Sequence, residues 1–372
     1  MSIYLDNSAT TRPCEAAVEQ MLHAMREDFY NPSALYAPAM GPEKMMKKCR
    51  EQILQSVHAP QGSRVVFVSG GTEADNLAIL GQQKKCRDKR ILYSAGEHPA
   101  VKEACQAVEG AQAVAVPYTR EGVVDLQALE ELMDESVALI CIMQVNNETG
   151  AIQPLEAIGE LKKRLCPQAH FHVDGVQGYL RVPFDMKACH ADSYALSGHK
   201  IHAPKGIGAL YVKKGVRILP RTFGGKQERK LRTGTEALPL IGAFGVAVSE
   251  LDIQKSLDTV KELKGYLTEK LINFEDITIN SPETATPYIL NFSVKGIRSE
   301  TMLHHLASKG VYVSSGSACS KGGKSHVLSA LGFEDNRADS ALRVSFSKHN
   351  TTEDCDALIY ALKDGIENLA RR

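Results

Sequence analysis

The sequence predicts an α/β fold, with a mostly parallel sheet in a large domain and a smaller α+β domain after it. Strand and helix patterns alternate between residues 64 and 196, which is typical of a parallel sheet with helices on both faces. A long helical stretch follows, and the remaining patterns mix strands with helices. With 372 residues and 43% hydrophobic content, the chain can bury a full core.

Two helix patterns precede this alternation, over residues 15–25 and 44–57, with the turn signal Asn31-Pro32-Ser33 between them. A buried-strand pattern over residues 64–68, followed by an apolar helical stretch, opens the alternation. Further strands are predicted over residues 90–95, 112–116, 137–145, 170–173 and 192–196. Helices are predicted between them over residues 99–108, 126–133 and 155–165.

The second half of the chain predicts the smaller domain. A mostly helical stretch over residues 238–274 carries the chain out of the large domain. Beyond it, strands are predicted over residues 288–294, 311–313 and 342–346, and helices over residues 301–308 and 353–369. We therefore expect a large domain over residues 14–250 and a small domain over residues 251–372. The N-terminal arm, residues 1–13, is expected to pack with the small domain.

Composition and charge argue against several kinds of partner. Lysine plus arginine and aspartate plus glutamate both number 44, so no global field recruits nucleic acid or a membrane surface. No leader pattern or membrane-length apolar run is present in the sequence, which predicts a cytoplasmic protein. The nine cysteines are dispersed and never in Cys-x-x-Cys spacing, so neither a disulfide framework nor a metal site is expected.

A lysine, Lys200, comes directly after Ser197-Gly198-His199 at the end of an apolar strand pattern. A lysine that forms a Schiff base with an aldehyde cofactor must be held rigidly and partly desolvated, so that its amine is available near neutral pH. The hydroxyl of Ser197 and the imidazole of His199 are groups that bind a phosphate and fix the position of the lysine. The alternative is a strand-ending turn with a solvated lysine.

Other strands of the alternation also end in polar residues. The strand over residues 64–68 is followed by Gly70-Gly71-Thr72 and a helix, which together offer free backbone N–H groups and a hydroxyl to a phosphate. The alternative is that Thr72 is only a helix N-cap. Because ligands bind at the carboxyl ends of parallel strands, we expect these side chains to meet at one edge of the sheet. The later strand ends add His98, Asn147, Asp174 and Gln177.

This set of groups is the one that a pyridoxal 5′-phosphate site requires. The carboxylate of Asp174 would pair with the protonated ring nitrogen, so that the ring withdraws electrons. Gln177 and Asn147 would hydrogen-bond the ring hydroxyl, and His98 would stack on the ring. Taken singly, Asp174 also fits a helix N-cap, Asn147 a turn, and His98 a loop position before Pro99.

Three features of the second half suggest further binding groups. The glycine-rich, basic segment 223–235 suits an anion, or else is a solvated loop. Cys319 lies in the segment Ser314-Ser-Gly-Ser-Ala-Cys-Ser-Lys-Gly-Gly-Lys324, where Lys321 and Lys324 favour its thiolate; the alternative is a flexible loop with an incidental cysteine. Arg343, inside an apolar strand pattern, requires an anion such as a substrate carboxylate or a structural ion-pair partner.

Six segments carry a resemblance to a known family, in the same order. They are Leu5-Asp-Asn-Ser-Ala-Thr-Thr11, Ser69-Gly-Gly-Thr-Glu-Ala-Asp-Asn76, Glu97-His98, Val145-Asn-Asn-Glu-Thr-Gly150, His172-Val-Asp-Gly-Val-Gln177 and Ser197-Gly-His-Lys200. The chain thereby resembles cysteine desulfurases of the NifS/IscS type, which are pyridoxal-phosphate enzymes of the class V aminotransferase group. The resemblance implies the fold type I of pyridoxal-phosphate transferases.

The resemblance also implies residue roles. Lys200, Cys319 and His98 would be catalytic, with Cys319 the nucleophile that accepts sulfur. Thr235 would reach the cofactor phosphate of a neighbouring subunit, which implies a homodimer. Asn7, Asn147 and Arg343 would bind substrate, Arg343 through the carboxylate. The cofactor-binding set would be Gly71, Thr72, His98, Asn147, Asp174, Gln177, Ser197, His199, Lys200 and Thr235.

The implied reaction converts L-cysteine to L-alanine and leaves a persulfide on Cys319, from which sulfur passes to an acceptor protein. The chain departs from the family pattern at Tyr36, at His202-Ala203-Pro204 and in a shorter loop after Cys319. These departures leave the acceptor open between an iron–sulfur scaffold and a tRNA-thiolation enzyme. Competing interpretations are an aminotransferase, a selenocysteine lyase or a non-catalytic sulfur-transfer partner. The glycine fingerprint of a dinucleotide dehydrogenase is missing.

Overall fold

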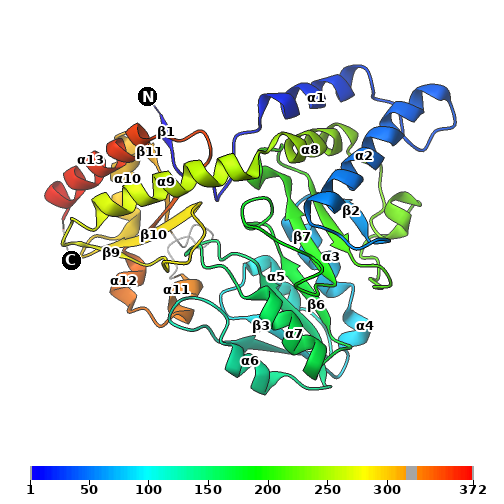
Figure 1. Ribbon diagram of the computed structural model, residues 1–372, viewed down its shortest axis with the longest axis horizontal. Coiled ribbons are helices and arrows are strands. Elements are labelled where there is room, and N and C mark those ends of the chain that lie inside the picture. The colour runs from blue at the N-terminus through cyan, green and yellow to red at the C-terminus, as the bar shows by residue number, and fades with distance from the viewer. Residues whose placement is uncertain (1, 316–324, 371–372) are drawn as a thin grey trace.

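A computed structural model describes residues 2–315 and 325–370. Within these residues, a seven-stranded sheet has the order β2-β8-β7-β6-β5-β3-β4 (Figure 1). Its strands are β2 (Arg64–Val68), β3 (Arg90–Ser94), β4 (Gln112–Val116), β5 (Val137–Met143), β6 (His170–Asp174), β7 (Ser193–Ser197) and β8 (Gly208–Val212). Only the pairs that β8 makes, with β2 and β7, are antiparallel within the described sheet, so the mostly parallel α/β fold is confirmed.

Helices cover both faces of this sheet. Leu77 and Ala78 of α3 and Val101 of α5 belong to the apolar clusters on one face. Residues such as Ile53, Leu129, Ile158 and Phe244 pack on the other. The helices of this part are α1 (Glu15–Arg26), α2 (Met40–Ser56), α3 (Gly71–Leu80), α4 (Gln83–Cys86), α5 (Pro99–Gln106), α6 (Leu126–Leu132), α7 (Leu155–Leu165) and α8 (Leu238–Glu250).

Several short elements were not predicted from the sequence, such as the helix Gln83–Cys86 and the strand Ile277–Ile279, and the differences at α2 and β8 have clear physical reasons. Helix α2 begins at Met40, four residues before the predicted start, because Pro42 lies in its first turn, where a missing N–H breaks no helical hydrogen bond. Strand β8 was not predicted. Its five residues are all buried, so they show no alternation of polar and apolar side chains from which a strand could be recognised.

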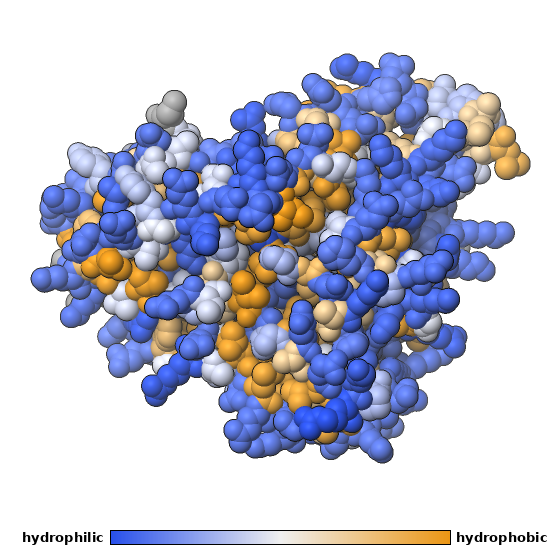
Figure 2. All heavy atoms as spheres, viewed as in Figure 1, coloured by the Kyte–Doolittle hydropathy of each residue, from blue (hydrophilic) through white to orange (hydrophobic). Residues whose placement is uncertain are grey.

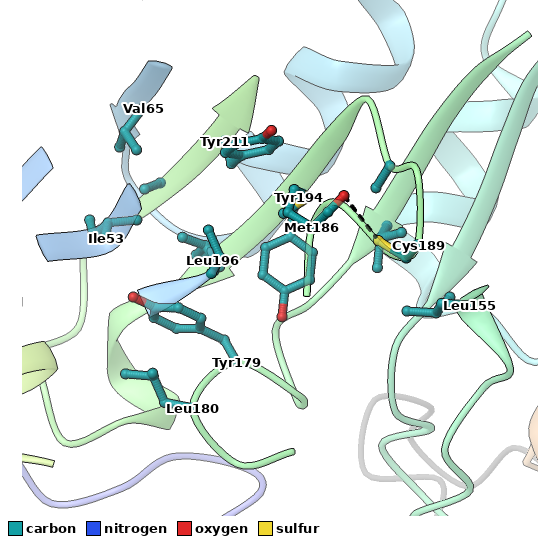
Figure 3. Packing of buried hydrophobic residues seen from close by; sticks show 14 of the residues in the cluster. Ile53, Val65, Leu155, Tyr179, Leu180, Met186, Cys189, Tyr194, Leu196 and Tyr211 are labelled. Atoms are coloured by element: carbon teal, nitrogen blue, oxygen red, sulfur yellow. Dashed lines mark hydrogen bonds between the residues drawn. The ribbon is translucent and has the colours of Figure 1, made fainter. Parts of the chain in front are cut away.

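The centre of the large core holds the strand that leads to Lys200. Figure 3 shows Tyr194 and Leu196 of β7 among Tyr179, Tyr211 and Ile53, and all five side chains are buried. The ring of Tyr194 stands edge-on to that of Tyr179, with centroids 6.4 Å apart, and its hydroxyl donates to Gln144 Oε1 at 2.5 Å. Packing on this face therefore fixes β7, while its alternate residues face α3.

The small α+β part is built on a four-stranded antiparallel sheet, with the order β12-β13-β10-β9 among the described residues. The strands are β9 (Ile277–Ile279), β10 (Ile289–Val294), β12 (Ser314–Ser315) and β13 (Ala341–Ser345). The helices are α9 (Ile253–Leu271), α10 (Ser299–Ser308), α11 (His326–Ala330), α12 (Asp335–Asp339) and α13 (Thr352–Asn368). A separate apolar cluster joins this sheet to α9, α10 and α13 through Phe292, Val344, Leu263, Leu306 and Leu358.

The N-terminal arm connects the two parts (Figure 1). Strand β1 (Ile3–Tyr4) pairs in parallel with β11 (Val311–Tyr312), and Leu5 is buried in the small core. Farther along the arm, the N–H of Thr11 donates to the carbonyl of His199 at 2.8 Å. The arm thus runs from the small sheet to the segment that holds Lys200. The domain limits after residues 13 and 250 stay a prediction.

Charged and polar residues cover most of the face in Figure 2; apolar residues show down its middle, and a smaller group lies at upper right, over the connection between α1 and α2. Phe29, Leu35 and Tyr36 in this connection, and Met40 at the start of α2, are exposed. No helix within residues 2–315 and 325–370 has the length and apolar character needed to cross a membrane. Neither does this part of the chain contain a group of three or more side chains placed to hold a metal ion.

Candidate active site

A cavity of about 560 Å³ lies where the parallel strands β6 and β7 end, facing the first turn of α3. Since the carboxyl ends of parallel strands meet at one edge of a sheet, residues far apart in the sequence converge here. Most of the predicted site residues line this cavity: Gly71, Thr72, His98, Asn147, Asp174, Gln177, Ser197, His199, Lys200 and Arg343.

Lys200 lies in a short turn (Gly198–Lys200) directly after β7. Its Nζ donates hydrogen bonds to the carbonyl of Ser8 and, at 2.9 Å, to that of Ala9. Burial lowers the pKa of Lys200 to about 7, and the positive charges of Arg181 and Arg343 add to this effect. At pH 7 about half of the Lys200 side chains would be neutral amines, compared with about one in 2,500 for an ordinary lysine of pKa about 10.4.

Asp174 ends β6 inside the cavity, with its Oδ1 accepting the N–H of Val176 at 2.9 Å. Burial raises the pKa of Asp174, while His98 and Lys200 oppose the shift. Among the described residues, no lysine or arginine forms an ion pair with this carboxylate. A buried carboxylate without a cationic partner is costly, so a bound cation such as a protonated ring nitrogen would stabilise it.

An anion would fit between α3 and the end of β7. The first turn of an α-helix leaves backbone N–H groups without helical partners, and α3 begins at Gly71 beside the cavity. Ser197 Oγ is buried and has no hydrogen-bond partner among the described residues. Thr72 adds a second hydroxyl to the lining. An unpaired buried hydroxyl beside a helix N-terminus suits a phosphate group.

Two of the three histidines that line the cavity, His98 and His199, are held in neutral form by burial. His98 caps α5, because its Nδ1 accepts the N–H of Ala100 at 3.1 Å; its Nε2 is thus the nitrogen left to carry a proton. Burial lowers the pKa of His98. Burial, together with Lys200, lowers the pKa of His199 to about 4, and its Nδ1 lies 3.2 Å from Thr10 Oγ1.

Arg343 reaches the cavity from β13 of the small sheet, and its side chain is buried. Its Nη1 donates to the carbonyl of Asn147 at 2.8 Å, and its Nη2 forms an ion pair with Asp6 at 2.8 Å. The Nε atom is buried without a partner in the described part of the chain. The structural ion pair that the sequence left open is therefore present, and the Nε–H group has no partner among the described residues.

Three predicted residues, Asn7, Gln177 and Thr235, lie differently from what was expected. Asn7 does not line the cavity: its Nδ2 donates to the carbonyl of Ser345 at 2.9 Å and to Asn350 Oδ1 at 3.1 Å. Gln177 lines it, but its Nε2 donates to the carbonyl of Ser8 and its Oε1 accepts from Arg181. Thr235 is exposed and outside the lining. Cys319, with Lys321 and Lys324, lies outside the described residues.

Sequence reasoning gave no role to a contact that joins the small part to the cavity. Ser325 Oγ donates to Glu148 Oε2 at 2.5 Å, and His326 Nε2 lies 2.8 Å from the carbonyl oxygen of Glu97. Burial raises the pKa of Glu148 to about 7. Ser325 and His326 come directly after the segment that contains Cys319. In the sequence, the only signal for this contact was the acidic residue Glu148 in the segment Val145-Asn-Asn-Glu-Thr-Gly150. Its partner Ser325 lies 177 positions away, so no local pattern could pair the two.

Comparison with known proteins gives a consistent result. The family model described as aminotransferase class-V matches residues 3–358. The cysteine desulfurase IscS of Methanosarcina thermophila is 37% identical over 99% of this chain and 93% of its own length. A solved NifS-like protein shares 33% identity, covers 99% of both chains and superposes with a TM-score of 0.90. A structure of SspA in complex with cysteine shares 30% identity over 94% of this chain and all of its own, with a TM-score of 0.83.

Proposed function

The chain belongs to the aminotransferase class-V family, and from this premise we propose that it is a pyridoxal-phosphate-dependent cysteine desulfurase, which converts L-cysteine to L-alanine. One observation carries the proposal. A lysine with a pKa near neutrality, a carboxylate that forms no ion pair with a described lysine or arginine, and an arginine from a second sheet line a single cavity. Relatives named cysteine desulfurase, which match 99% of this chain and 93% of their own length, support this choice of reaction.

The cavity suits the cofactor group by group. The N–H groups at the start of α3, with Thr72 and Ser197, would hold the phosphate, and Asp174 would pair with the ring nitrogen. Lys200 Nζ is the amine available to the aldehyde carbon. When bound, pyridoxal phosphate supplies an electron sink next to the substrate α-carbon.

The residues of the chain would then bind the substrate and move its protons. Arg343 would hold the carboxylate of L-cysteine, using its Nε–H group, which has no partner among the described residues. Lys200 Nζ, neutral in about half of the molecules at pH 7, would take the α-proton. His98 Nε2 would carry a proton to or from the substrate.

The sulfur step requires a nucleophile, and we assign it to Cys319. The Cys319 thiolate attacks the substrate sulfur, so that an S–S bond forms while the C–S bond of the substrate breaks. The β-carbon gains a proton, the α-carbon regains the proton that Lys200 Nζ took, and the product leaves as L-alanine, with a persulfide left on Cys319. The sulfur would pass to an acceptor protein, either an iron–sulfur scaffold or a tRNA-thiolation enzyme.

We further propose a cytoplasmic homodimer in which Thr235 of one subunit contacts the phosphate held by the other. Thr235 is exposed and outside the cavity of its own chain, as a residue offered to a neighbour would be. The exposed apolar side chains between α1 and α2 offer a contact surface. The eight described cysteines are free, in keeping with a reducing compartment.

The test is mass spectrometry of the purified enzyme after incubation with L-cysteine, with alanine measured in the same sample. We expect alanine together with a mass increase of one sulfur on Cys319, and loss of both in Lys200→Ala. Cys319→Ser should lose the persulfide and most alanine formation. The matched control is Cys14→Ser, since Cys14 is the only described cysteine that is partly exposed.

Two results would contradict the proposal. Full alanine production by Cys319→Ser would remove Cys319 from the reaction. A keto acid formed without a persulfide would indicate an aminotransferase or another lyase.

A further inference from the structure

Four buried polar side chains form a continuous hydrogen-bonded chain between β6, β7 and α3. Ser193 Oγ lies 2.7 Å from His170 Nε2 and 2.8 Å from His172 Nδ1, and His172 Nε2 lies 3.1 Å from Asp75 Oδ1. Residues at every second position of a strand share a face, and Ser193 is the register partner of His172. All four residues are at most 3% exposed.

The two ends of this chain reach different cavities. Asp75 lines the catalytic cavity. His170 lines a second cavity of about 460 Å³, together with Asp192, Lys162, Lys85 and Arg217. His170 begins β6 and Asp192 directly precedes β7, so this second cavity lies at the amino ends of the strands whose carboxyl ends form the active site. The hydrogen-bonded chain therefore runs along the strands, from the cavity at their amino ends to the cavity at their carboxyl ends.

The chemistry of Ser193 couples its two histidines. A serine hydroxyl has one proton, so Ser193 can donate to one imidazole only and must accept from the other. Two complete patterns satisfy every contact. In one, both histidines carry their proton on Nε2 and Asp75 is ionised; in the other, both carry it on Nδ1 and Asp75 is protonated.

We propose that His170, Ser193, His172 and Asp75 form a proton relay between the second cavity and the active site. A proton binds His170 Nδ1, and the Nε2 proton of His170 passes to Ser193 Oγ. The Ser193 hydroxyl proton passes to His172 Nδ1, and the Nε2 proton of His172 passes to Asp75 Oδ1. One proton enters, one arrives on Asp75, and neither histidine keeps a net charge.

The surroundings of each group favour this direction. Burial lowers the pKa of His170 to about 4 and that of His172 to about 3, so both pass a proton without storing it. The groups that act on His170 are Asp192, Lys85 and Lys162. Burial raises the pKa of Asp75 well above its usual range, and the acidic groups Asp174, Glu97 and Cys105 act in the same sense.

The purpose that we infer for this relay rests on the proposed function. When substrate fills the catalytic cavity, Asp75 can still exchange protons through the second cavity. A protonated Asp75 leaves Asp174 as the ionised carboxylate of the pair, since two nearby buried carboxylates do not both hold a charge. The relay would thus maintain the charge that pairs with the cofactor ring nitrogen.

Nitrogen NMR of ¹⁵N-histidine-labelled, full-length protein tests the relay without using activity. We expect the ring protons of His170 and His172 to be on the same nitrogen at every pH, and to move from Nε2 to Nδ1 together if Asp75 becomes protonated. His170→Gln and His172→Gln assign the signals. Opposite tautomers for the two rings in the unaltered protein would overturn the proposal, whether or not any variant folds.

Kinetics supply a second, separate test. Ser193→Ala should lower kcat for alanine formation at least tenfold with KM little changed, and Ser193→Thr, which restores a hydroxyl, should recover most of it. The matched control is Ser293→Ala, since Ser293 is also a buried strand serine with two hydrogen bonds, at 2.8 Å from Asn280 and 2.7 Å to Arg337. Unchanged kcat in Ser193→Ala would overturn the relay. If the unaltered enzyme made no alanine, the proposed function would be wrong. The NMR experiment would still test the relay, because it does not depend on activity.

Discussion

Burial determines the chemistry of individual residues in this cavity, and it acts in opposite senses on bases and acids. Lys200 and Glu148 are both brought to a pKa of about 7, the lysine from above and the carboxylic acid from below. The common cause is the cost of keeping a charge away from water. Each group is therefore divided between its charged and neutral forms near pH 7.

Glu148→Gln should make stability less dependent on pH. The folded pKa of Glu148 is about 7, above its usual 4.5, so between these values the folded protein keeps a proton that the unfolded chain has lost. The free energy of unfolding therefore falls as pH rises through this window, by up to about 3 kcal/mol. Glutamine cannot ionise, and its oxygen can still accept from Ser325.

Urea unfolding at pH 5 and pH 8 measures this effect. Glu148→Gln should match the unaltered protein at pH 5 and be the more stable of the two at pH 8. The control is Glu121→Gln, because Glu121 is exposed. An equal difference between Glu148→Gln and the unaltered protein at both pH values would show that the carboxyl does not titrate in this window.

At the scale of elements, the site depends on how closely α3 approaches the end of β6. Gly71 begins α3, and a Cβ built on it would lie 2.5 Å from Cγ2 of Val176, two residues after β6 ends. Real Cβ atoms do not come so close to another carbon, so only glycine allows this contact. The approach brings the N–H groups of α3 to the same cavity as Lys200.

Gly71→Ala should weaken pyridoxal phosphate binding at least tenfold, because the new methyl group would push the start of α3 away from the cavity. Gly265→Ala is the matched control: Gly265 lies in α9 and has no atom within 4 Å of a Cβ position. That control should bind cofactor normally. Its free energy of unfolding should be about 0.5–1 kcal/mol higher than that of the unaltered protein, because alanine favours a helix more than glycine does. Absorbance titration measures cofactor binding, and equal affinity in both variants would contradict the role given to Gly71.

At the scale of the whole molecule, the N-terminal arm joins both cores to the active site. Leu5 is buried in the small core, Asp6 pairs with Arg343, and the carbonyls of Ser8 and Ala9 accept from Lys200. Three successive parts of one short segment thus pack in the small core, pair with Arg343 and accept hydrogen bonds from Lys200, the residues to which we assign substrate binding and catalysis.

Leu5→Ala should lower the free energy of unfolding by about 3 kcal/mol, because it leaves a cavity in the small core. It should also weaken cofactor binding, since the arm holds Lys200 in place. The control is Leu22→Ala in α1, where the leucine is 43% exposed and the expected cost is below about 0.5 kcal/mol. Denaturant unfolding and cofactor titration measure both effects. Normal cofactor affinity in a destabilised Leu5→Ala would show that the arm does not position Lys200.

The sequence by itself determined the α/β alternation and the positions of Lys200, Asp174 and Gly71, because each is marked within a few residues of its own strand. Tertiary structure alone decided which of these groups are charged and which distant residues meet. Strand β8, the Ser325–Glu148 contact and the chain from His170 to Asp75 left no local pattern. The charges depend on burial away from water, and the contacts join residues that are distant in the sequence. Neither can be read from the order of neighbouring residues alone.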